Sequence, residues 1–196
     1  MKILFLISLA LTVCLSSIKG QPSHTTLGVE IGHQHIFLLS QGYSSVPYHT
    51  RAGVKAGFFL EQEIKPSLGL RFNLFYDLKY FQIIPSDFLP FAYHSIALPI
   101  KAIFKTGKIF RFGLGIIPRV LMPFKSSNTQ CLFNFGPSVE IALKFKKIMR
   151  FSLYCNYDLL TVHYKTYGDF NNLAIGLSCA VTLKKIKKRR VIYSPG

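Results

Sequence analysis

Five side chains in segments rich in Ser, Pro, Gly and Tyr are of types found in hydrolytic sites: Ser44, His49, Asp87, His163 and Asp169. A nucleophilic hydroxyl needs a base within hydrogen-bonding reach and a third group that orients the base. The spacing of these five residues pairs no nucleophile with a base. The sequence therefore predicts no catalytic residue and no enzyme activity.

His33 and His35 share one face of a predicted strand at the spacing of a chelating pair. Two ligands without a nearby carboxylate or cysteine make a weak metal site, because zinc sites use three or four protein ligands. We expect both histidines at a rim of the fold, and we predict neither a metal nor a cofactor.

A larger set of charged residues alternates with apolar ones, most clearly over 68–80. One parity there is apolar or aromatic, and the other carries Arg71, Asn73, Asp77 and Lys79. Successive strand side chains point to opposite faces, so this segment is predicted to be a β-strand with one apolar and one charged wall. It exceeds an ordinary strand of about 5–6 residues and suits a tilted membrane crossing, which needs about 9–11.

The same alternation recurs along the chain and predicts eight strands, at about 26–37, 52–62, 67–81, 94–105, 108–121, 131–145, 148–162 and 172–184. The connections between them are alternately long and short, as in outer-membrane barrels with short periplasmic turns and longer outer loops. The sequence thus predicts an all-β fold, an eight-stranded antiparallel up-and-down transmembrane β-barrel.

Alternation alone does not say which wall faces inward. A soluble exported β-barrel that carries an apolar ligand would put the apolar wall inside. Here the apolar wall is too rich in Phe, Leu and Ile for a closed eight-stranded interior, and glycines lie on the polar wall, where a narrow interior needs small residues beside large ones. We therefore expect the charges inside and the apolar wall in lipid.

Charges of opposite sign in this lumen can neutralise one another, which matters because an unpaired buried charge is costly. The predicted lumen charge network comprises Glu30, Lys55, Arg71, Asp77, Lys101, Arg111, Arg119, Glu140 and Asp158. Eight strands leave an interior just wide enough for side chains to fill it. A structural network is therefore favoured over a permeation path, and a small-solute channel remains the alternative.

The termini differ in composition from the predicted barrel at 21–184. Residues 1–20 have a basic start, an apolar run and a small final residue, which indicates a signal peptide cleaved near Gly20. A transmembrane anchor is the alternative, but the run is shorter than the roughly 20 residues that a helix needs. Export of a barrel of this kind places it in a bacterial outer membrane.

The chain has a formal net charge of +16, and a basic tail at 185–196 contributes to it. We interpret the tail as solvated and attracted to an anionic surface or an envelope protein, since nucleic acid conflicts with export. Aromatic residues cluster near the long loops and predict either an interfacial belt or a binding surface: Tyr80, Phe88, Phe91, Tyr93, Phe124, Tyr164 and Tyr167.

Several strands resemble the outer-membrane β-barrels of Bacteroidetes that are often labelled porin-family proteins. The resemblance is carried by Ala97-Leu98-Pro99-Ile100-Lys101, Gly107-Lys108, Phe112-Gly113-Leu114-Gly115, Asn134-Phe135-Gly136-Pro137-Ser138-Val139-Glu140-Ile141, Ser152-Leu153-Tyr154-Cys155-Asn156-Tyr157-Asp158-Leu159-Leu160 and Asn172-Leu173-Ala174-Ile175-Gly176-Leu177. It implies a non-enzymatic outer-membrane barrel, either structural or presenting its loops for binding, with membrane lipids and the barrel assembly machinery as partners. Family members usually end on an aromatic residue, whereas this chain continues past Leu183 into its basic tail.

Overall fold

The computed structural model describes residues 24–40, 48–49, 52–83, 91–123, 132–146, 148–159, 162–164 and 168–187. The predicted signal peptide at 1–20, most of the predicted tail and most residues of the long loops lie outside these ranges.

Strands make up nearly all of the described chain, and they form one sheet that closes on itself. Their bounds are β1 (His24–Ser40), β2 (Tyr48–His49), β3 (Ala52–Lys65), β4 (Leu68–Ile83), β5 (Phe91–Ala97), β6 (Ile100–Thr106), β7 (Phe110–Ile116), β8 (Arg119–Pro123), β9 (Leu132–Asn134), β10 (Pro137–Phe145), β11 (Met149–Tyr157), β12 (Val162–Tyr164) and β13 (Gly168–Lys187).

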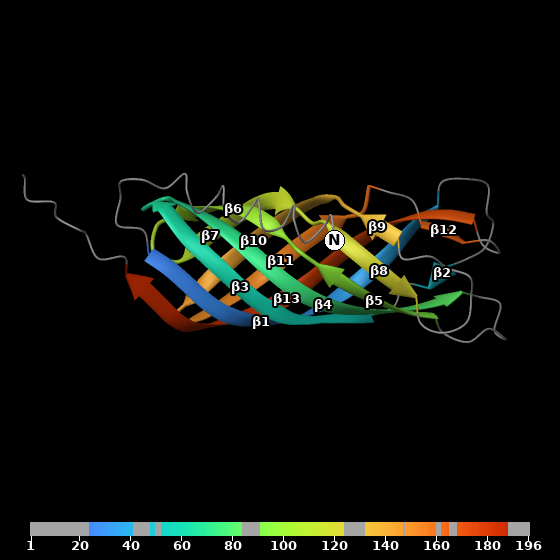
Figure 1. Cartoon of the computed structure of the whole chain (residues 1–196), viewed down its shortest axis with the longest axis horizontal. Coiled ribbons are helices and arrows are strands. Elements are labelled where there is room, and N and C mark those ends of the chain that lie inside the picture. Colours follow the sequence, from blue (N-terminus) through green and yellow to red (C-terminus); the bar gives the residue numbers. More distant parts are fainter. Residues whose placement is uncertain are drawn as a thin grey trace, which may run out of the picture.

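Neighbouring strands are antiparallel, and β1 pairs with both β3 and β13, which closes the barrel (Figure 1). Four strands of the wall are interrupted. Each consists of two consecutive segments that follow one another along the same position of the wall: β5 and β6, β7 and β8, β9 and β10, and β11 and β12. The result is a closed, eight-stranded antiparallel barrel, which confirms the predicted fold class.

The sequence pattern predicted unbroken strands where the structure has these pairs. Three of the interruptions include or adjoin a proline, namely Pro99, Pro118 and Pro137, and proline has no backbone N–H to donate to the ladder. The wall still closes around them, because Leu98 N donates to Pro118 O at 2.8 Å and Asn73 N donates to Pro99 O at 2.9 Å. Proline therefore interrupts the strands without opening the barrel.

One end of the barrel, called here the tight-turn end, carries the turns at 66–67, 107–109 and around Lys146. Gly107 and Lys146 adopt left-handed conformations in two of them, with φ of 67° and 54°, as short turns between antiparallel strands commonly require. β1 begins at this end and β13 finishes there, with His24 paired to Lys187. β13 thus runs past the expected limit of 184, because exposed lysines can continue the ladder at a solvated rim.

The two walls of the barrel have opposite chemistry. Outward side chains are apolar and exposed, including Ile31 and Leu177 at 64% each and Ile141 at 52%. Inward side chains include buried charges on many strands, such as Arg71 at 0% and Glu140 at 3%. The predicted orientation, charges inside and apolar residues outside, is what the structure shows. Within the described ranges no helix is long and apolar enough to cross a membrane.

Inward glycines face large inward side chains on the neighbouring strand. Gly28 pairs with Phe59, and a Cβ on Gly28 would lie 2.4 Å from the phenyl ring. Gly176 pairs with Tyr154, and a Cβ there would lie 2.5 Å from the phenol oxygen. The narrow interior is therefore filled by alternating large side chains with glycines across the strands.

Candidate functional site

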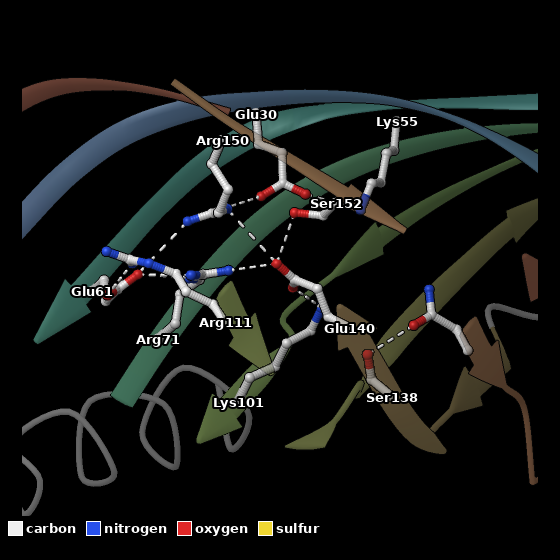
Figure 2. A network of polar contacts seen from close by, with 11 residues as sticks. Glu30, Lys55, Glu61, Arg71, Lys101, Arg111, Ser138, Glu140, Arg150 and Ser152 are labelled. Atoms are coloured by element: carbon white, nitrogen blue, oxygen red, sulfur yellow. Dashed lines mark hydrogen bonds and ion pairs between the residues drawn. The ribbon is translucent and has the colours of Figure 1, made fainter. Parts of the chain in front are cut away.

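The described interior is built around Glu140 of β10, whose carboxylate accepts three short hydrogen bonds (Figure 2). Arg71 Nη1 and Lys101 Nζ each donate to it at 2.8 Å, and Ser152 Oγ donates at 2.9 Å. These donors come from β4, β6 and β11. One carboxylate therefore connects four strands around the lumen.

Glu61 of β3 is a second acceptor in the same network. Its Oε2 accepts from Arg71 Nε at 3.1 Å and Nη2 at 2.7 Å, while its Oε1 accepts from Arg111 Nη1 at 2.8 Å. Arg71 thus uses both sides of its guanidinium, one toward Glu61 and the other toward Glu140. Such charge-assisted bonds are stronger than neutral ones.

Glu30 of β1, the strand next to β3, is the third glutamate of this group (Figure 2). Lys55 Nζ lies 3.1 Å from Glu30 Oε1, and Arg150 Nη2 lies 2.9 Å from Glu30 Oε2. Arg150 also lies 3.6 Å from a Glu61 oxygen and 3.7 Å from a Glu140 oxygen. Arg150 is consequently the cation that all three glutamates share.

Aromatic rings line the cations of this network. The Arg150 guanidinium carbon lies 4.9 Å from the centre of the Phe59 ring, and Lys55 Nζ lies 3.6 Å from the centre of the Tyr154 ring. Cation–π attraction of this kind is strongest where water is excluded. The aromatic rings therefore fill space and stabilise buried positive charge together.

A second, smaller cluster surrounds Asp158, which lies at the interruption between β11 and β12. Asp158 Oδ2 accepts from Arg119 Nη1 at 3.3 Å and from Asn172 Nδ2 at 3.1 Å, and Lys79 Nζ lies 3.9 Å away. Asp77 is buried in β4, two residues before Lys79, but its Oδ1 has no hydrogen-bond partner among the described residues.

Of the predicted network residues, the structure brings eight into ion pairs, namely Glu30, Lys55, Arg71, Lys101, Arg111, Arg119, Glu140 and Asp158. Asp77 is buried but joins none of the ion pairs recorded between described residues. The predicted network did not include five further residues that form ion pairs, namely Glu61, Glu63, Lys79, Lys105 and Arg150. The inward position of two of them could have been predicted from strand parity, because Arg150 has the same parity as Ser152 and Glu61 the same parity as Lys55.

The histidine pair lies on the outer wall. His33 and His35 are both exposed, with ring centres 5.2 Å apart in an edge-to-face arrangement. Across the described part of the chain, no three His, Cys, Asp or Glu side chains are grouped so that they could hold a metal ion.

Two sets of predicted residues lie outside what the structure describes. For the hydrolytic types these are Ser44 and Asp87 entirely, together with the side chains of His49, His163 and Asp169. For the aromatic set they are Phe88, Phe124 and Tyr167 entirely, together with the side chains of Tyr80, Phe91, Tyr93 and Tyr164.

Comparison with known proteins agrees on the fold. No protein-family model matches the sequence, and no curated protein matches it. Among solved structures, the chain resembles Ail, the attachment invasion locus protein of Yersinia pestis, in complex with the heparin analogue sucrose octasulfate. The TM-score is 0.51 and the identity 10%, over 83% of this chain and 100% of that one.

Neisserial surface protein A is similar too, with a TM-score of 0.50 and 13% identity, over 81% of this chain and 99% of that one. The fold is therefore that of the eight-stranded outer-membrane β-barrels.

Proposed function

We propose that this protein is a non-enzymatic, integral β-barrel of a bacterial outer membrane, with a closed interior that stabilises it and long loops that bind a partner. The observation that carries the proposal is the outer wall. Large apolar side chains there are half exposed or more on strands around the barrel, for example Phe58 at 58%, Ile116 at 55% and Leu153 at 50%. Contiguous apolar surface of this extent is not stable in water, whereas lipid covers it at no cost.

The structural role of the interior is supported by how the charges are held. Each carboxylate of the main network, on Glu30, Glu61 and Glu140, is bound by at least two cations. A conducting path needs mobile water and accessible charge, but Arg71 is completely buried and Glu140 nearly so. A closed barrel accounts for these contacts better than a small-solute channel does.

Binding through the loops is the remaining part of the proposal. The strands extend toward the loop end, opposite the tight turns, where the predicted aromatic residues cluster in the sequence. Membership of the Bacteroidetes-type family, cleavage near Gly20 and attraction of the basic tail to an anionic surface complete the proposal. They are supported by the strand motifs, by the composition of residues 1–20 and by the charge of residues 185–196. Assembly by the barrel machinery is proposed on the family resemblance alone.

The test is expression in a Gram-negative host, followed by membrane fractionation and electrophoresis of heated and unheated samples. We expect the protein in the outer-membrane fraction, with a folded band that migrates faster until it is boiled. A barrel recovered in the soluble periplasmic fraction would contradict the proposal and favour the carrier of an apolar ligand.

A further inference from the structure

A cavity of about 540 Å³ lies at the tight-turn end of the barrel. We call it the tight-turn mouth, and its lining residues are His24, Thr26, Phe59, Glu61, Glu63, Lys105, Arg111, Lys144, Ile148, Met149, Arg150, Ala180, Thr182 and Lys185. Its volume falls within the roughly 300–1,000 Å³ of small-molecule sites. The mouth is separate from the loops to which the proposed function assigns binding.

Positive charge predominates in the mouth. Five of its side chains are cationic, Lys105, Arg111, Lys144, Arg150 and Lys185, against the two carboxylates of Glu61 and Glu63. Those two carboxylates already form ion pairs with cations of the protein. Glu61 accepts from Arg71 and Arg111 at 2.7 and 2.8 Å, and Glu63 lies 3.0 Å from Lys105 Nζ.

Two lysines in the mouth have no ion-pair partner among the described residues. Among the residues that the structure describes, no carboxylate oxygen lies within ion-pair distance of Lys144 or Lys185. Lys144 is in β10 and Lys185 in β13, while Lys105 and Arg111 approach from β6 and β7. Cations from four separate strands thus face one cavity.

We propose that the tight-turn mouth binds a small organic anion that carries two or more phosphate groups. A single carboxylate would leave one of the two unpaired lysines, Lys144 or Lys185, without a strong partner. Two phosphate groups offer several acceptor oxygens to each lysine and to the neighbouring arginine. Ile148, Met149 and Phe59 supply an apolar surface for the organic part of the ligand. The proposal needs only the closed barrel and is independent of where the barrel resides.

The test uses the full-length protein refolded in nonionic detergent micelles, with inorganic pyrophosphate as the probe in calorimetric titration. We expect saturable binding that weakens about tenfold in each of the variants Lys144→Gln and Lys185→Gln, because each removes a charge-assisted hydrogen bond. Both lysines lie near the solvated rim, so we expect the heat-modifiable band to remain unchanged and to report folding independently.

The chain offers matched controls one and two positions away. Lys184→Gln and Lys146→Gln remove the same charge from exposed residues that do not line the cavity. We expect these controls to change the affinity less than twofold.

Equal weakening by the controls would mean general attraction to a basic surface and would overturn the proposal. Absence of pyrophosphate binding would overturn it as well. A third arm replaces pyrophosphate by citrate, and tighter binding of citrate would refute the assignment to phosphate groups.

Discussion

Arg71 donates to Glu140 across the lumen, from Nη1 to Oε1 at 2.8 Å, although the two residues are 69 positions apart in the sequence. Their strands, β4 and β10, are not neighbours in the wall, since β6 and β7 lie between them. Arg71 is completely buried and also binds Glu61 of β3. The pair therefore bridges the inside of the barrel, and it is the basis for regarding the interior as closed.

Glu140→Gln tests how much this bridge contributes to the free energy of unfolding. The substitution keeps the shape but leaves Arg71 and Lys101 with less negative charge, and breaking a buried pair from one side costs about 3–5 kcal/mol. We expect the variant to unfold at a lower urea concentration in lipid vesicles. Unfolding is measured as the loss of the heat-modifiable band.

Glu63→Gln is the matched control, because Glu63 pairs with Lys105 at the more exposed rim. An exposed pair contributes about 1 kcal/mol or less. Equal effects of the two substitutions would show that the central network does not stabilise the barrel.

Glu140 and Lys101 should also be energetically coupled, because their side chains bond at 2.8 Å. Lys101→Met combined with Glu140→Gln removes both partners of this contact. We expect the double variant to be less destabilised than the sum of the two single variants, by about 0.5–3 kcal/mol. Strict additivity in the urea-unfolding cycle would count against the contact.

Gly176→Ala tests the pairing of inward glycines with large side chains. A Cβ on Gly176 would lie 2.3 Å from the His33 carbonyl oxygen and 2.5 Å from the Tyr154 phenol oxygen. Overpacking of this kind costs about 1–3 kcal/mol. We expect a clear drop in the unfolding midpoint.

Gly113→Ala should have a smaller effect. A Cβ on Gly113 would lie 3.1 Å from Ile103 Cδ1 and 3.3 Å from Glu140 Cβ, which are longer distances than at Gly176. An effect as large as that of Gly176→Ala would argue against the proposed fit between glycines and large residues.

Ile141→Arg tests whether the outer wall contacts lipid. Ile141 is 52% exposed near the middle of β10, and an arginine at the bilayer midplane costs about 2–4 kcal/mol in outer-membrane barrels. Thr106→Arg, at the tight-turn rim, should cost about 0–1 kcal/mol. Refolding yields in vesicles would reveal the difference, and a water-exposed wall would tolerate both substitutions equally.

Much of the fold could be predicted because a strand has a period of two. Arg71 and Asp77 alternate with Leu70, Phe72 and Leu74, and that pattern assigns two opposite walls. The bulk of the apolar side chains and the glycines on the polar wall then indicate that the charges face inward. The alternation did not predict the interruptions at Pro99 and Pro118, which arise because proline cannot donate to the ladder.

The contacts within the interior could not be predicted in the same way. Which residues meet across the lumen depends on the stagger of strands around a closed barrel, and parity does not contain that information. Arg150 shows the difference. Its parity marks it as inward, but its position beside Glu30 and Glu61, which lie about 120 and 90 positions away in the sequence, follows only from the closed barrel.

The central claim is that the charged interior closes the barrel, and single-channel recording in planar bilayers tests it most directly. The protein refolded to homogeneity, as judged by its heat-modifiable band, should insert without producing stable conductance steps. Glu140→Gln should weaken folding without creating such steps. Large, reproducible steps from the unmodified protein would contradict the account and establish a small-solute channel instead.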